Sequence, residues 1–164
     1  MTRFDNLWHA HRVAVLGYLI RRTDDPQDAA DLLAETYAVI WRRLTSVPAS
    51  PEDRPWIFGV AANVLANHDR GARRRSRLES ALRFEVRGLV VAPVDPAVLA
   101  LRAALQDLEP LDREVLTLSA WEGLTANEIA LVLDLTATAV STRQYRARAR
   151  LRAVLVDDPV VTLA

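Results

Sequence analysis

The stretch Leu124–Arg152, LTANEIALVLDLTATAVSTRQYRARARLR, predicts two helices joined by a tight turn. Thr125 can cap the first helix, and Glu128 three residues later completes a capping box. The helix is broken at Asp134, and Thr136 is the next candidate N-cap residue. A short capped helix, a turn of about three residues and a longer helix are typical of a helix-turn-helix.

The longer helix of this motif has two different faces. Its apolar residues fall on one side at close to helical spacing, and they are Val140, Ala147 and Leu151. The other side is polar and rich in arginine, with Ser141, Thr142, Tyr145, Arg146 and Arg148. A face of this kind suits contact with DNA, and the alternative is an ordinary helical hairpin with a solvated arginine face.

The composition favours a small helical protein. The 164 residues suffice for one domain or two small ones, and a hydrophobic content of 51% provides for a core. Five glycines and few strand-like runs favour helices. No apolar run approaches the ~20 residues of a membrane span, and the N-terminus does not read as a signal peptide. We therefore expect a cytoplasmic protein with no membrane insertion of its own.

The residues that usually carry catalysis or bind metals are scarce. The chain has no cysteine, so disulfides and cysteine-based zinc sites are excluded. Its histidines, His9, His11 and His68, come without a plausible set of further ligands. There is no Gly-rich phosphate loop and no plausible catalytic triad. We expect no enzyme activity, no catalytic residue, no metal site and no cofactor.

The charges are balanced in number but not in position. All 21 basic residues are arginine, against 21 acidic residues. Arg70–Arg77 and Arg143–Arg152 each hold five arginines and no acidic residue, so the rest of the chain is strongly acidic. Two basic patches on an acidic body indicate two separate surfaces that face phosphates.

Helical periodicity and loop residues divide the chain into two parts. The expected helices are Phe4–Arg22, Pro26–Leu44, about Pro55–Arg70, Asp95–Leu108 and Leu111–Trp121, followed by the helix-turn-helix. Thr45–Arg54 reads as a loop, and Gly71 can kink or end the third helix before a basic segment, Arg73–Phe84. Glu85–Pro96 is non-periodic and reads as a linker. The predicted fold is all-α, with helical domains at 1–84 and 97–156, a linker at 85–96 and a tail at 157–164.

Three segments, taken in order, resemble a known family. They are DAADLLAETYAVIWRRL at 28–44, RPWIFGVAANVLANHDRGARRR at 54–75 and ALQDLEPLDREVLTLSAWEGLTANEIALVLDLTATAVSTRQYRARARLR at 104–152. Their order and spacing resemble the extracytoplasmic-function sigma factors of bacteria over nearly the whole chain. The resemblance implies a transcription initiation factor whose partners are core RNA polymerase, promoter DNA and an anti-sigma factor. In this family the first domain opens the minus-ten element, and the second reads the minus-thirty-five element.

The resemblance also assigns residues to these roles. Those at the positions where the family docks on polymerase are Asp28, Asp31, Leu32, Glu35 and Thr36. The loop at 45–54 is where the family captures a flipped base, beside Trp56 and Asn63. The remaining positions implied to contact DNA are Arg70, Arg73, Arg74, Arg75, Thr136, Thr138, Ser141, Thr142, Tyr145 and Arg146. A core role for Trp56 and a purely exposed role for Asn63 are the structural alternatives.

Two positions depart from the family pattern in the recognition helix. Ser141 replaces a usual long cation, and Gln144 interrupts the apolar stripe between Val140 and Ala147. A sigma-like adaptor without DNA contacts is therefore one alternative function. A dimeric helix-turn-helix repressor is another, although no spare long helix or leucine stripe offers a dimer interface.

Overall fold

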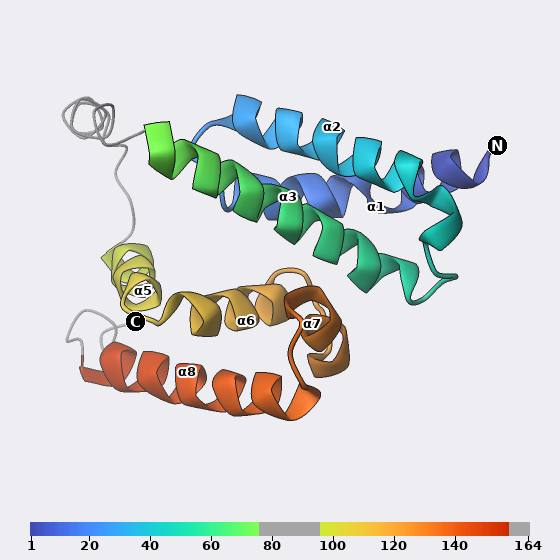
Figure 1. Cartoon of the computed structure of the whole chain (residues 1–164). Helices are drawn as coiled ribbons and strands as arrows, with labels where there is room; N and C mark the ends of the chain where they lie inside the picture. The colour runs from blue at the N-terminus through green and yellow to red at the C-terminus, as the bar shows by residue number, and fades with distance from the viewer. Residues whose placement is uncertain (76–95, 158–164) are drawn as a thin grey trace.

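The computed structural model describes residues 1–75 and 96–157, with side chains except at 71–75, 96–99 and 154–157. Every regular element in these two ranges is a helix, which confirms the predicted all-α class. Helices α1 to α3 form the first domain and α5 to α8 the second. Figure 1 shows the two groups packed side by side. The predicted linker and tail lie outside the described residues, apart from Pro96, which begins α5, and Asp157, which ends α8.

Within residues 1–75, the first domain contains three helices and one short 3-10 turn. Their bounds are α1 Arg3–Ile20, α2 Pro26–Arg42, the turn Leu44–Ser46 and α3 Asp53–Arg75. A capping box starts α1, since the Thr2 hydroxyl accepts a hydrogen bond from the Asp5 N–H at 3.2 Å and the Asp5 carboxylate accepts one from the Thr2 N–H at 2.8 Å. That backbone hydrogen bond lowers the pKa of Asp5. Asp25 is the N-cap residue of α2, and Pro26 is the first residue of that helix.

Helix α3 differs from its prediction at both ends. It begins at Asp53, two residues before Pro55, because proline fits the first turn of a helix as well as its first position. It also continues through Gly71 to Arg75. One glycine costs a helix only about 1 kcal/mol relative to alanine, which a helix of this length can absorb.

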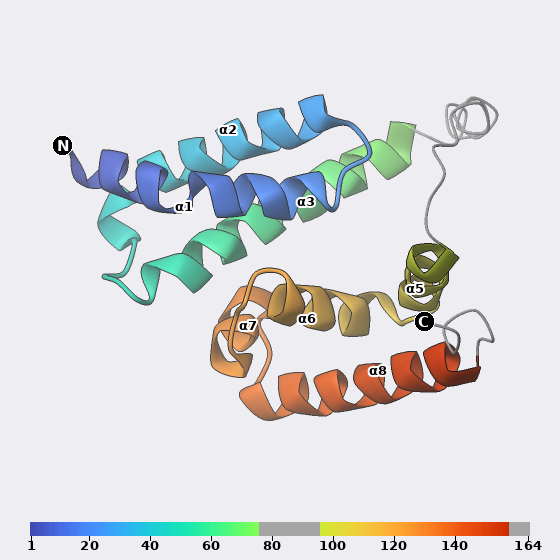
Figure 2. The same cartoon turned by 180° about the vertical axis from the view of Figure 1, so that it is seen from behind.

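The second domain holds four helices. They are α5 Pro96–Gln106, α6 Pro110–Ala120, α7 Ala126–Leu133 and α8 Ala137–Asp157. Helix α8 packs against α5, α6 and α7. Seen from both sides, α8 lies at the edge of the second domain that is remote from α1 to α3 (Figures 1 and 2). The face of α8 that points away from the core is therefore open to solvent.

The two domains share one hydrophobic core. Buried side chains of α1, α2 and α3 form a continuous cluster with Val115, Leu118, Ile129, Val132 and Val140 of the second domain. A smaller cluster within the second domain contains Leu108, Leu116 and Ala147. The predicted apolar stripe of the recognition helix therefore faces inward, and the domains meet chiefly where α7 lies against α3.

Candidate nucleic-acid interface

The helix-turn-helix forms where the sequence predicts it. Thr125 and Glu128 make the capping box, with the Thr125 N–H donating to the Glu128 carboxylate at 2.8 Å. Asp134 adopts a left-handed conformation, φ 54° and ψ 51°, which asparagine and aspartate tolerate better than most residues. Thr136 then caps α8 by accepting the Ala139 N–H at 3.1 Å. The turn Asp134–Thr136 sets the angle between α7 and α8.

The predicted DNA-contacting side chains of α8 are accessible. Ser141, Thr142, Tyr145 and Arg146 are exposed, and Tyr145 is 77% exposed. Thr136 and Thr138, which lie at the start of the helix, are exposed as well. A recognition helix reads DNA with residues near its N-terminal end, so this placement fits docking in a major groove.

The basic patch at Arg143–Arg152 is smaller than its sequence suggests. Arg143 donates to Asp112 of α6 at 2.7 Å and lies 3.4 Å from Glu109, so it pairs within the domain. The hydrogen bond to Asp112 raises the pKa of Arg143. The other arginines of the patch are exposed and form no ion pair with any described residue, and they are Arg146, Arg148, Arg150 and Arg152. Gln144 is half-buried beside the apolar stripe.

A surface pocket of about 450 Å³ lies at the start of α3. It brings the loop before α3 together with the predicted residues Trp56 and Asn63, and Leu131 of α7 also lines it. Trp56 is half-buried and packs on the core, so part of its side chain has the core role that was the alternative to contact with DNA. Asn63 is exposed. Arg3 fixes the preceding loop by donating to the backbone oxygens of Leu44, Val47 and Pro48.

The predicted polymerase-docking residues on α2 divide into two sets. Asp31 and Glu35 are exposed and Asp28 is half-buried, so these carboxylates form an acidic edge. Leu32 and Thr36 are core residues, 2% and 0% exposed, and the Thr36 hydroxyl donates to the Leu32 backbone oxygen at 2.7 Å. Helical periodicity turns both residues toward α1 and α3, so neither contributes to the exposed edge of α2, and their part in polymerase docking stays a prediction.

The basic segment at the end of α3 is described only in part. Arg70 is exposed and donates to the Asn67 side-chain oxygen. Arg73, Arg74 and Arg75 lie in α3, but their side chains are outside the described residues. Their contact with the DNA backbone stays a prediction.

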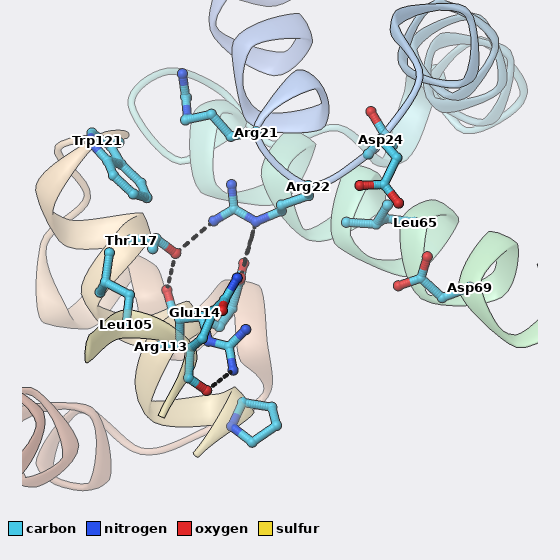
Figure 3. Close-up of a pocket in the computed structure, with 13 residues that line it drawn as sticks. Arg21, Arg22, Asp24, Leu65, Asp69, Leu105, Arg113, Glu114, Thr117 and Trp121 are labelled. Atoms are coloured by element: carbon cyan, nitrogen blue, oxygen red, sulfur yellow. Dashed lines mark hydrogen bonds and ion pairs between the residues drawn. The ribbon is translucent and has the colours of Figure 1, made fainter. Parts of the chain in front are cut away.

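A polar contact between the domains was not predicted from the sequence. Just after α1, Arg21 donates two hydrogen bonds to the Glu122 carboxylate, at 2.6 and 2.7 Å. Arg22 donates to Glu114 at 3.0 Å and to the Thr117 hydroxyl at 2.8 Å, as Figure 3 shows. These partners are 92 to 101 residues apart in sequence, and no local pattern links them.

Part of this contact is closed to solvent. The Glu122 side chain is 2% exposed, and the backbone oxygen of Glu122 accepts a hydrogen bond from Arg54 of α3. Tyr18 donates its hydroxyl to Glu114 at 3.2 Å, and burial raises the pKa of the Tyr18 phenol. A cavity of about 520 Å³ adjoins the contact, between the end of α1 and helices α5 and α6 (Figure 3).

His11 lies 3.2 Å from Asp53 at the start of α3. Across residues 1–75 and 96–157, no group of three or more His, Asp and Glu side chains is arranged to hold a metal ion. No helix within those ranges is long and apolar enough to cross a membrane.

Comparisons with known proteins agree with this architecture. The family description Sigma-70 region 2 matches residues 7–75, and Sigma-70, region 4 matches residues 99–151. CnrH of Cupriavidus metallidurans is 32% identical over 94% of this chain and 87% of its own length. The sigma-E factor of Streptomyces coelicolor is 31% identical, over 93% of this chain and 86% of that protein. The ECF sigma factor BldN of the same species is 29% identical, and this chain spans 61% of its length.

Solved structures show the same fold. CnrH in complex with the cytosolic domain of CnrY superposes with a TM-score of 0.66 at 28% identity, over 94% of this chain and 88% of that one. RpoE bound to the anti-sigma factor NepR from Bartonella quintana gives a TM-score of 0.70 at 20% identity, over 94% and 98%, a likeness of fold alone. The two matched regions, in this order and on this fold, place the chain in the extracytoplasmic-function group of bacterial RNA polymerase sigma factors.

Proposed function

We propose that this chain binds core RNA polymerase and directs initiation at specific promoters, with the first domain reading the minus-ten element and α8 reading the minus-thirty-five element. The exposed polar face of α8 is the observation that carries the proposal. It combines side chains that can bond base edges, such as Arg146, with neighbouring arginines that pair with no described acid. Unpaired arginine is available for phosphates and guanine edges.

The pocket at the start of α3 is proposed to hold a base of the opened strand. Flipping a base costs a few kcal/mol, which stacking on an aromatic ring and hydrogen bonding can recover. Trp56 provides the aromatic wall and Asn63 an amide at its rim. Arg70, together with Arg73, Arg74 and Arg75, is proposed to hold the DNA backbone near this pocket.

The acidic edge of α2 is proposed to dock on the polymerase. Asp31 and Glu35 project into solvent, and Asp28 extends the same edge. A negative edge of this kind complements a basic protein surface and increases the rate of encounter. We also propose that an anti-sigma factor regulates this chain: RpoE, which shares this fold, was solved in complex with the anti-sigma factor NepR, and the related CnrH was solved in complex with the cytosolic domain of CnrY.

Binding to core polymerase tests the proposal directly. Wild-type protein is expected to co-purify with core polymerase, and Asp31→Arg is expected to weaken this binding at least tenfold through like-charge repulsion. The matched control is Asp107→Arg, which reverses an exposed carboxylate in the second domain. Absence of binding by the wild-type protein would favour a repressor that acts without polymerase. Equal losses in both variants would show that α2 is not the docking edge.

A further inference from the structure

The loop between α2 and α3 is held in place by α1. It lies at the end of the first domain where α1 begins, as both views show (Figures 1 and 2). Residues along the whole loop line the pocket at the start of α3, and they are Arg43, Pro48 and Glu52. The shape of this pocket therefore depends on where α1 places the loop.

Arg3 of α1 holds the first half of the loop. Its guanidinium donates to the backbone oxygen of Leu44 at 3.3 Å, to that of Pro48 at 3.2 Å and to that of Val47. Hydrogen bonds from a charged donor are stronger than those between neutral groups, and a guanidinium offers five donors in a fixed plane. Pro48 links this contact to the pocket directly, because its oxygen accepts from Arg3 and the same residue lines the pocket wall.

His11 of α1 holds the second half of the loop. Its Nε2 atom lies 3.2 Å from a carboxylate oxygen of Asp53, and the two side chains are only 14% and 12% exposed. Asp53 follows Glu52 and begins α3, so this contact fixes the point where the loop enters the helix. Arg3 and His11 are about 12 Å apart along α1 at 1.5 Å per residue. Helix α1 thus fastens the loop at two separate points.

We propose that Arg3 and His11 are positioning residues for recognition of the minus-ten element, which set its base preference through the loop without touching DNA. This inference rests on the proposed function of the pocket. A flipped base recovers its cost through stacking and hydrogen bonds, and walls that are already in place spare the cost of ordering them on binding. Without the two contacts, only a fraction of molecules has the loop in the competent position. The apparent affinity for the base then falls by that fraction.

Promoter selection by the holoenzyme tests the proposal. Core polymerase with each variant selects from a library that is randomised in the minus-ten element and keeps one minus-thirty-five sequence that the wild type prefers. Arg3→Ala and His11→Ala are each expected to reduce preference at the captured base about tenfold, as for a loop in place in about one molecule in ten. Arg12→Ala and His9→Ala are the matched controls and are expected to keep the wild-type preference. They remove the same residue types from α1, and Arg12 and His9 bond to each other within that helix.

A second measurement separates positioning from a general structural role. Thermal unfolding and binding of the holoenzyme to a duplex that carries only the minus-thirty-five element are expected to be the same for Arg3→Ala, His11→Ala and their controls. Arg3→Lys keeps the charge but replaces the planar fork with a single ammonium group, so it is expected to show a preference between those of the wild type and Arg3→Ala.

Three results would count against the account in different ways. A minus-ten preference in Arg3→Ala and His11→Ala equal to that of the controls would overturn the proposal. A parallel loss of minus-thirty-five binding would also overturn it, because the two residues would then only support the fold. Absence of any minus-ten preference in the wild type would instead overturn the proposed function. Should Arg3→Ala fail to fold, Arg3→Lys decides, and a full wild-type preference in that variant would overturn the role of the guanidinium.

Discussion

Arg143 of α8 donates a hydrogen bond of 2.7 Å to Asp112 of α6, whose side chain is only 3% exposed. Removing the arginine leaves a buried carboxylate without its main partner, and that loss is costly. We expect Arg143→Ala to lower the melting temperature of the second domain clearly. Arg146→Ala is the matched control in the same helix, and as an exposed substitution it is expected to change stability by less than about 0.5 kcal/mol.

Thermal unfolding followed by circular dichroism checks this prediction. Equal melting temperatures for Arg143→Ala and Arg146→Ala would mean that Arg143 is a solvated member of the basic patch. In that case the arginine would be as available to DNA as its neighbours.

Arg146 is expected to read a base rather than only a phosphate. It lies on the exposed face of α8, one turn after Thr142. Ser141 stands where the family usually has a long basic side chain, and it is too short to make the same contact. Arg146→Ala is expected to cost about 1–3 kcal/mol at the preferred minus-thirty-five sequence and to relax preference at one base pair. Promoter selection with the polymerase-bound variant measures both effects. A uniform loss on all sequences would assign Arg146 to a phosphate instead.

The arginines at the end of α3 are expected to act through charge alone. Replacing Arg73, Arg74 and Arg75 together with alanine is expected to weaken promoter complexes of every sequence. It is also expected to reduce the salt dependence of complex formation, because fewer counterions are released. Arg102→Ala, at an exposed position in α5, is the control. An unchanged salt slope in the triple variant would leave these arginines with no part in binding DNA.

Alkaline pH is expected to destabilise the first domain through Tyr37. Burial raises the pKa of Tyr37 from its ordinary value of 10.0 to about 12, so the folded state favours the neutral phenol. The stability from this shift is fully present below pH 10 and is lost as pH rises through about 12. The chain has no lysine or cysteine, but burial also raises the pKa of Tyr18, so Tyr37 accounts for only part of the alkaline loss of stability. Urea unfolding between pH 9 and 12 is expected to show a smaller loss in the free energy of unfolding for Tyr37→Phe than for the wild type. Equal losses in the two proteins would show that Tyr37 does not contribute to the alkaline destabilisation.

Local chemistry made the helix-turn-helix predictable from the sequence. The two helix starts are marked by Thr125 with Glu128 and by Thr136. The capping hydrogen bonds of these residues span three residues or fewer along the chain. The roles of Leu32 and Thr36 were not separable in this way. Where an apolar stripe borders an acidic edge on one helix, the sequence does not show which residues at the border are buried. In α2, packing against α1 and α3 determines that Leu32 and Thr36 are.

Long-range relationships lay beyond the sequence pattern. The partner of Arg143 lies in α6, and the partner of Arg21 lies in the loop between α6 and α7. An arginine-rich run looks the same in the sequence whether or not each arginine has such a partner.

Transcription in vitro from a genomic promoter library, with core polymerase and this chain as its only sigma factor, tests the central claim most directly. The wild-type protein is expected to start transcription at a small set of promoters that share minus-ten and minus-thirty-five sequences. Asn63→Ala changes an exposed residue and is expected to lower initiation at all of them, while Arg146→Ala is expected to alter which promoters are selected. Starts spread over unrelated sequences, or the same promoters at the same levels with both variants, would contradict the account.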